Sequence, residues 1–293
     1  DTGCGLLPGN RGVSIRIDWT APGLVALGAL AALMTMVREQ DAFFVVGPAI
    51  DFLGWLWETR RWRRLAAAAA GALAFALTFL PQALSYLALN DRIGPSQVTS
   101  RKMAWSSPHA WDVLFSPEHG FVAWTPVAAV AIVGLFAVLM AGWRPPFRER
   151  WSGARRRGQI RLGVSLLAMA AAQVYIVGAV ESWTLAGAFG QRRFVSLTPL
   201  LVVGLAVIMA AARAGVRLVA AGLVIAVAIW WNVGLMVQFG AGLMDRQRLD
   251  LPRNAYNTFV VVPRRLPDIA WRYAFDRGSF YRRDPPTRNP GSP

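Results

Sequence analysis

The chain has 293 residues, of which 55% are hydrophobic and only 16% are charged, and its mean hydropathy is +0.39. Soluble domains carry about 25% charged residues, and a chain of this length cannot bury so much apolar surface, which excludes a water-soluble globule. The formal net charge of +15 comes almost entirely from arginine, and we attribute it to the basic loops that orient membrane proteins rather than to a nucleic-acid partner. A single cysteine, Cys4, excludes an internal disulfide framework, and two isolated histidines form no metal-ligand pattern.

The chain divides into three parts by composition. Residues 1–20 lack the basic start, the apolar stretch and the cleavage site of a signal peptide, and the sequence begins with Asp1 rather than methionine. We therefore expect residues 1–21 to be the edge of a fragment whose N-terminal part lies upstream. Residues 22–239 are predicted to form a polytopic transmembrane domain, and residues 240–293 a periplasmic or interfacial C-terminal tail.

The apolar runs predict helices in chain order. Pro22–Val37 and Ala42–Trp57 are short and are separated by the polar residues Arg38–Asp41, which indicates a tight helical hairpin that crosses the membrane incompletely. Five longer runs of roughly 18–25 residues suffice to cross a hydrocarbon core of about 30 Å. These runs are Leu65–Leu89, Phe121–Trp143, Leu162–Val180, Val195–Ala212 and Leu218–Phe239. The predicted fold class is an all-α integral membrane protein with about seven transmembrane or partly spanning helices.

The placement of arginine predicts the orientation. The links Glu58–Arg64, Trp143–Arg161 and Arg213–Arg217 are strongly basic, and alternation of the spans puts all three on one side. The positive-inside rule assigns that side to the cytoplasm of a bacterial inner membrane. The loop Asp91–Gly120, which has no net charge, and the link Glu181–Phe194 then share the periplasmic side with the tail.

The tail has its own pattern. Val260–Pro267 followed by Ile269–Phe275 predicts a short amphipathic helix that lies on the membrane surface. The proline-rich stretch Asp284–Pro293 is expected to be disordered.

Several polar and aromatic residues are expected to share the periplasmic face. Arg192 and Arg193 precede a span at its outer end, where they have no topological role, so we expect them to bind a lipid phosphate; the alternative is contact with ordinary phospholipid headgroups. Tryptophan-rich loops suit stacking on a sugar ring, although an aromatic belt at the membrane interface would have the same composition. The residues expected to line the resulting cavity are Arg38, Gln40, Asp41, Glu181, His109 and Trp111.

Two acidic residues have structural alternatives. Arg38 and Asp41 could instead form an internal pair that only locks the hairpin. Asp51 lies within an apolar stretch, and we expect it to pair with nearby arginines rather than to act in a site. The sequence contains no glycine-rich nucleotide loop, zinc motif or nucleophile elbow. If the chain is a transferase, its donor is therefore expected to be a membrane lipid rather than a soluble nucleotide sugar.

Three segments carry a resemblance to a known family. Met36–Ala42, Leu114–Pro126 and Gly190–Leu200 (GQRRFVSLTPL) resemble bacterial membrane glycosyltransferases of the GT-C class. Within that class the chain resembles the protein mannosyltransferase and aminoarabinose transferase group (glycosyltransferase family 39-like), over roughly residues 20–283. The resemblance implies a GT-C-like fold, a polyprenyl-phosphate-linked sugar donor and inverting transfer to a periplasmic acceptor without a nucleotide. It also implies that Arg192 and Arg193 hold the donor phosphate.

The chain departs from the family in one respect. The catalytic acidic residue of the class lies in the first outer loop, after the first span, and nothing in this chain matches that region. We therefore name no catalytic residue, expect it upstream, and expect the chain alone to be inactive. No cofactor or metal site is predicted, and the need for a divalent cation stays open. The alternative functions are a non-enzymatic transporter or lipid flippase subunit, and a structural membrane subunit without a site.

Overall fold

The computed structural model describes residues 19–95, 97, 101–106, 108–143, 153–184, 187–212 and 214–280. This part of the chain is helical and holds no β-strand; its one β-bridge joins Met103 and Val180. The helices are α1 (Ala21–Val37), α2 (Val46–Thr59), α3 (Arg64–Asn90), α5 (Ala110–Phe115), α6 (Phe121–Trp124), α7 (Val127–Trp143), α8 (Gly153–Ala179), α9 (Thr198–Ala212), α10 (Val216–Gly240), α11 (Leu251–Tyr256) and α12 (Val262–Phe275). Short 3₁₀ turns η1 (Glu39–Val45), η2 (Arg192–Leu197) and η4 (Arg277–Phe280) and the π-helical turn η3 (Asn257–Val261) complete them.

Four helical segments of the described residues are long and apolar enough to cross a membrane: Arg64–Asn90, Arg156–Ala179, Arg192–Ala212 and Val216–Gly240. They correspond to four of the five long runs that the sequence analysis expected. The all-helical architecture and the presence of membrane-length helices are therefore confirmed, whereas the count of about seven spans stays a prediction.

The fifth expected span is interrupted. Phe121–Trp143 divides into α6 of 4 residues and α7 of 17 residues, separated at Thr125 and Pro126. Proline lacks a backbone N–H, and its ring disfavours a helical conformation in the preceding residue; Thr125 has left the helical region, with φ −135° and ψ 70°. At 1.5 Å per residue, α7 alone reaches about 26 Å, short of a typical hydrocarbon core.

The N-terminal hairpin forms, with a different second arm. Helix α1 ends at Val37, the chain turns at Arg38, and the next residues follow the 3₁₀ turn η1 before α2 begins at Val46. The second arm thus contains 14 α-helical residues rather than the whole stretch Ala42–Trp57.

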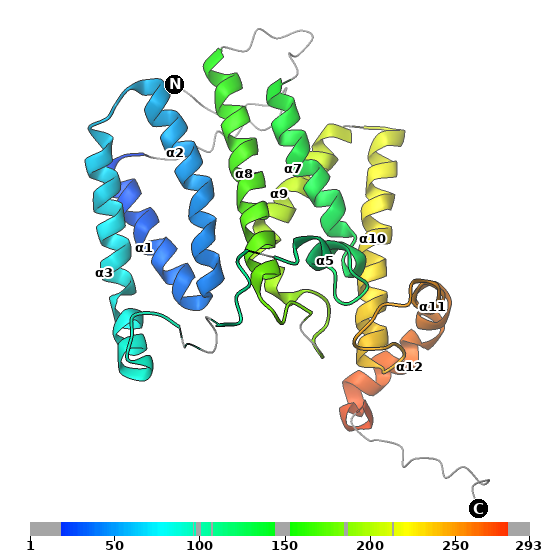
Figure 1. Cartoon of the computed structure of the whole chain (residues 1–293). Coiled ribbons are helices and arrows are strands. Elements are labelled where there is room, and N and C mark those ends of the chain that lie inside the picture. Colours follow the sequence, from blue (N-terminus) through cyan, green and yellow to red (C-terminus); the bar gives the residue numbers. More distant parts are fainter. Residues whose placement is uncertain are drawn as a thin grey trace, which may run out of the picture.

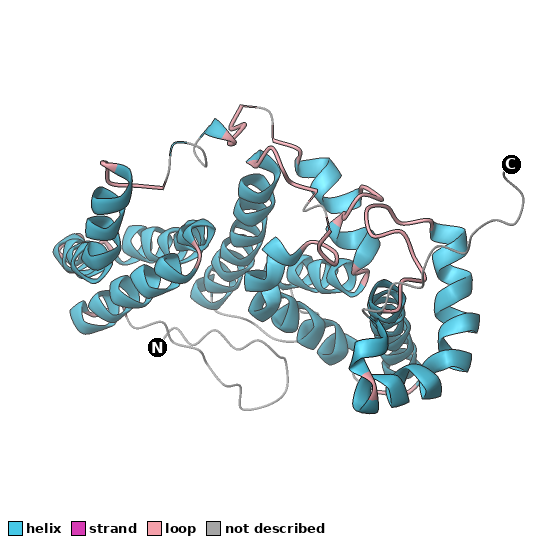
Figure 2. Cartoon of the chain, turned by 90° about the horizontal axis from the view of Figure 1, so that it is seen from below, coloured by secondary structure: helices cyan, strands magenta, loops and turns pink. Residues whose placement is uncertain are grey.

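The helices pack in chain-distant pairs (Figures 1 and 2). Helix α3 lies against α1, α2 lies against α8, and α7 lies between α8 and α9, with α10 at the far edge. The main hydrophobic core contains buried side chains from the elements between α5 and α9, including Leu135, Val177 and Phe194. Helices α1 and α3 approach closely at Gly28, where a Cβ atom would lie 2.0 Å from the Gly71 carbonyl oxygen. Small residues at such contacts are typical of helix packing within membranes.

The connections alternate between the two ends of the bundle (Figure 1). The turn between α2 and α3, the start of α8 and the link between α9 and α10 lie at the upper end in this view. The hairpin turn η1, the loop that leads to α5, the turn η2 and the helices α11 and α12 lie at the lower end. The helix ends that flank the three basic links therefore share one end, as the alternation in the sequence predicts.

The tail forms a helix where the sequence predicts one. α12 covers Val262–Phe275 and, together with η3 and α11, lies beside the lower end of α10. Buried amides hold this contact, because Gln238 Nε2 donates to Thr258 Oγ1 at 2.9 Å and Asn254 Nδ2 donates to Gln238 Oε1 at 2.9 Å. The expectations for residues 1–18 and for Asp284–Pro293 lie outside the described residues.

Candidate functional site

The hairpin turn and η2 meet at the lower end of the bundle. Gln40 Nε2 donates to the carbonyl oxygen of Arg193 at 2.7 Å, and Arg38 Nη2 donates to the same oxygen at 3.1 Å. The two segments are more than 150 residues apart in the sequence, since the pairs are separated by 153 and 155 positions. Three of the residues that the sequence analysis singled out are therefore neighbours, joined through the backbone of Arg193.

Helix α8 supplies the support for this contact. Gln173 is fully buried on α8; its Nε2 donates to the Gln40 carbonyl at 3.0 Å, and its Oε1 accepts from Gln40 Nε2 at 3.4 Å. A buried amide is costly to leave unpaired, so the reciprocal bonds hold the hairpin turn in one register on α8. The sequence analysis missed Gln173, although a glutamine within an otherwise apolar span was a visible signal.

The arginine side chains lie close together. The guanidinium of Arg193 donates from Nη1 to the Ser182 carbonyl at 3.1 Å, and the positive charges of Arg192 and Arg38 lie close enough to repel it. Arg192 is exposed, and within the described residues its side chain makes no hydrogen bond or ion pair. No carboxylate pairs with any of the three arginines in that part of the chain. We call Arg38, Arg192 and Arg193 the arginine cluster.

Asp41 is buried in the hairpin turn, where its backbone N–H donates to the Arg38 carbonyl oxygen at 2.9 Å. The residue is only 4% exposed, and among the described residues the carboxylate oxygen Oδ1 of Asp41 has no hydrogen-bond partner. It forms no ion pair with Arg38 there, so the internal pair considered as an alternative is absent from the described structure. The nearby Gln191 is also buried; its Nε2 donates to the Trp183 carbonyl at 2.9 Å, while its Oε1 is left without a partner.

The loop before α5 lies against the lower end of α8. Ala104 N donates to the Ala179 carbonyl at 2.6 Å, and Glu181 N donates to the Lys102 carbonyl at 2.8 Å. The imidazole of His109 stacks on Trp183 with ring centroids 6.0 Å apart, and its Nδ1 lies 3.4 Å from the Asp112 carboxylate. The structure thus places His109 against the segment that leads to the arginine cluster.

Two other expected residues contribute little to this arrangement. Trp111 is 75% exposed and packs on Phe115 of its own helix, with ring centroids 4.5 Å apart. Glu181 is exposed, and only its backbone makes a contact that joins the loop to α8. Neither side chain contacts the arginine cluster within the described residues.

A second histidine occupies a buried position. His119 is 0% exposed and stacks on Trp124 with ring centroids 4.9 Å apart and an interplanar angle of 9°. Burial lowers the pKa of its imidazole below the ordinary value of 6.5, against the opposing effect of the nearby backbone of Ala188 and Arg246. Neither ring nitrogen makes a well-aligned hydrogen bond within the described residues. His119 is therefore neutral at pH 7 and packs as an aromatic residue.

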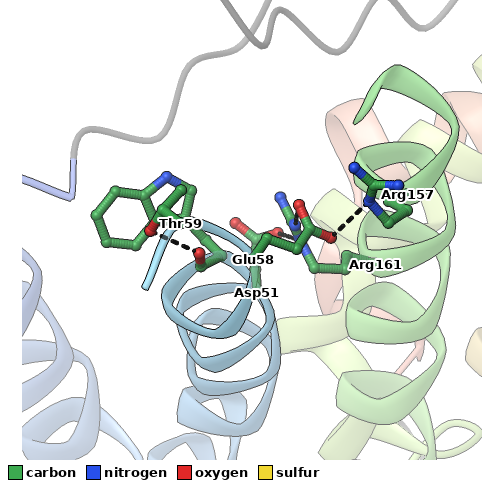
Figure 3. Close-up of polar contacts among 6 residues, drawn as sticks. Asp51, Glu58, Thr59, Arg157 and Arg161 are labelled. Carbon is green, nitrogen blue, oxygen red and sulfur yellow. Dashed lines mark hydrogen bonds and ion pairs between the residues drawn. The ribbon is translucent and has the colours of Figure 1, made fainter. Parts of the chain in front are cut away.

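The acidic residues of α2 lie at the opposite end (Figure 3). Arg161 Nε lies 3.0 Å from Asp51 Oδ1, and Arg161 Nη1 lies 2.7 Å from Glu58 Oε2. Arg157 Nε lies 3.5 Å from the other oxygen of Glu58. Asp51 thus pairs with an arginine, as expected, but the arginine comes from α8. This ion cluster joins α2 to α8, and the Gln40–Gln173 contact joins the turn η1 before α2 to the same helix.

Within the described residues, no group of three or more His, Cys, Asp or Glu side chains is placed to hold a metal ion. Comparisons of the chain with protein-family models, with curated proteins and with solved structures find no match.

Proposed function

We propose that this chain binds a polyprenyl-phosphate-linked sugar at the arginine cluster and belongs to a membrane glycosyltransferase that passes the sugar to an acceptor on that side of the membrane. One observation carries the proposal: Arg38 from the hairpin and Arg192 and Arg193 from η2 lie together at the end of a membrane-length segment, and no carboxylate among the described residues neutralises them.

The chemistry of the cluster favours a phosphate. Guanidinium groups stay charged at any biological pH and bind phosphate through two parallel hydrogen bonds. Three such groups near one another are mutually repulsive, and an anion bound between them would offset that repulsion. Because Arg38 and Arg193 already have backbone partners, Arg192 has the freest guanidinium for a ligand.

The position of the cluster favours a lipid. Arg192 begins the membrane-length segment Arg192–Ala212, and we infer that the cluster lies at the boundary of the hydrocarbon core. Val195 and Val202 on the same segment are 62% and 57% exposed. An ionic headgroup at the cluster would therefore have its prenyl chain beside an apolar surface, where burial of methylene groups is favourable.

The proposed transfer uses the cluster at the leaving group. The oxygen of an acceptor hydroxyl attacks the anomeric carbon, the bond from that carbon to the phosphate oxygen breaks, and its electron pair leaves with the phosphate. The acceptor proton passes to a base, for which the family resemblance implies an acidic side chain. The arginines stabilise the negative charge that develops on the polyprenyl phosphate, a preorganised electrostatic contribution.

Binding of undecaprenyl phosphate to the purified chain tests the site. We expect Arg192→Ala to weaken binding by about 10–150-fold, because a hydrogen bond to a charged group contributes about 1.5–3 kcal/mol. Arg192→Lys should recover part of the loss, since lysine keeps the charge without the planar fork. The variant should fold normally, because the Arg192 side chain has no partner within the described structure.

Arg248→Ala is the matched control, because Arg248 is also exposed and its side chain also makes no hydrogen bond or ion pair within the described residues. Equal binding by the native chain and by the alanine variants at both positions would refute the donor site. If Arg192→Ala weakened lipid binding as expected but the protein in its native membrane transferred no sugar, the lipid site would stand and the transferase would be rejected.

A further inference from the structure

The turn between α2 and α3 forms a second basic site at the upper end of the bundle. Its residues Arg60–Arg64, with the sequence RRWRR, line a surface pocket of about 480 Å³. Arg60 ends α2 in the left-handed conformation, with φ 53° and ψ 24°, which is uncommon for a residue with a side chain. Backbone bonds from Arg64 N to the Arg61 carbonyl and from Leu65 N to the Trp62 carbonyl, both 2.9 Å, then lead directly into α3.

The arginines of this turn have few partners. The guanidinium of Arg60 lies over the ring of Trp57, 4.6 Å from its centroid. The nearest acidic residue in the sequence, Glu58, is already paired with Arg157 and Arg161. Within the described residues, Arg61, Arg63 and Arg64 form no ion pair. The pocket therefore presents concentrated positive charge that the protein itself does not neutralise there.

The surroundings of the pocket are apolar and aromatic. Trp57 and Trp62 meet edge to face with ring centroids 6.1 Å apart, and they are 63% and 46% exposed. Leu65, the second residue of the 27-residue apolar helix α3, is 48% exposed. Tryptophan is typical of the headgroup level of a bilayer, so we expect the pocket to lie at the boundary between the hydrocarbon core and the headgroups.

We propose that the Arg60–Arg64 turn binds the headgroup of an anionic phospholipid in the leaflet at the upper end of the protein. Basic clusters directly after a membrane helix attract anionic lipids, and the exposed Leu65 and Trp62 side chains would contact the acyl chains. A soluble anion would use the arginines but not this apolar surface, which is why we assign the pocket to a lipid. The inference is independent of the donor site at the lower end.

Photo-crosslinking with a photoactivatable phosphatidylglycerol tests this proposal. With the purified full chain in detergent, we expect crosslinks within residues 57–65, and far fewer with a matched phosphatidylcholine probe. The double variant R61Q/R63Q should reduce crosslinking there about 25-fold, at about fivefold per arginine. R61K/R63K keeps both charges and should retain most of it. Purified protein is used so that any effect of these arginines on membrane insertion does not enter the readout.

The control is R264Q/R265Q on α12, which removes two exposed arginines at the other end of the bundle. It should leave crosslinking within residues 57–65 unchanged. Equal losses in the two double variants, or equal crosslinking by the two lipids, would overturn the proposal. Displacement of the lipid by inorganic phosphate at a similar concentration would also overturn it, in favour of a soluble anion.

Discussion

Removal of Arg161 tests whether the ion cluster of Figure 3 holds α2 against α8. Arg161→Met leaves Asp51 and Glu58 without their shared cation, while the methionine still fits beside Gly54, where an added Cβ would meet the Arg161 side chain. Breaking a buried ion pair costs about 3–5 kcal/mol. Because the Asp51 and Glu58 side chains are 17% and 27% exposed, we expect a loss near the lower end, about 3 kcal/mol.

Two further variants isolate the cause. Arg157→Met removes a guanidinium whose side chain is 59% exposed and 3.5 Å from Glu58, so its loss should be below about 1 kcal/mol. The triple variant R161M/D51N/E58Q removes all three partly buried charges and should return within about 1 kcal/mol of the native chain, because neutral groups need no counter-ion.

The assay is reversible unfolding in mixed detergent micelles, monitored by the circular dichroism of the helices. The free energy of unfolding is compared among the native chain and the three variants. If R161M lost no more stability than R157M, or if the triple variant were no more stable than R161M, the uncompensated carboxylates would not be the cause and the reasoning would be refuted.

Three other outcomes follow from the structure. Gly134→Val should destabilise the chain by about 1–3 kcal/mol, because a Cβ there would lie 1.9 Å from a backbone oxygen of α9, whereas Gly222→Val, with open space around it, should be nearly neutral in the same unfolding assay. The native chain should lose stability as the pH falls below about 6.5, because the imidazole of His119 takes up a proton more readily in the unfolded chain than in its buried position, and His119→Phe should not show this loss. The same pH dependence of the free energy of unfolding in both proteins would contradict this. Single cysteines at Glu118 and Ala214 in a cysteine-free background should react with an impermeant thiol reagent from opposite sides of the membrane, and same-side labelling would reject the alternation of the helices.

The sequence predicted the long helices because length and apolarity are local properties of a segment. Leu65–Leu89 and Leu218–Phe239 match α3 and α10 closely, since neither stretch needs a partner to be recognised as membrane-length. The positions of proline were a less reliable guide to where helices end. Pro81 lies inside α3 without ending it, while Pro126 separates α6 from α7. The difference is tertiary: Asn232 Nδ2 of α10 donates to the Trp124 carbonyl and to Thr125 Oγ1, both at 3.1 Å, which gives polar groups at the break a partner from a distant helix.

The sequence predicted which residues belong to the candidate site but not how they contact one another. The pattern around Arg192 and Arg193 and the polar hairpin turn could be read from the sequence, and the alternation of spans placed them at one end. Their contact through the Arg193 carbonyl, and the support from Gln173, could not be read in this way. The sequence does not specify which of several polar residues at one end will meet, because that depends on the rotation of each helix about its axis.

The sequence by itself determined that this protein is helical, that its helices belong in a membrane and that its basic links share one end, because hydrophobic length and charge act segment by segment. Only the tertiary structure decided which segments touch. Asp51 pairs with Arg161, 110 residues away, and Gln40 pairs with Gln173, 133 residues away. The physical reason is that a buried charge or amide must find a partner, while the identity of that partner is set by how neighbouring helices pack.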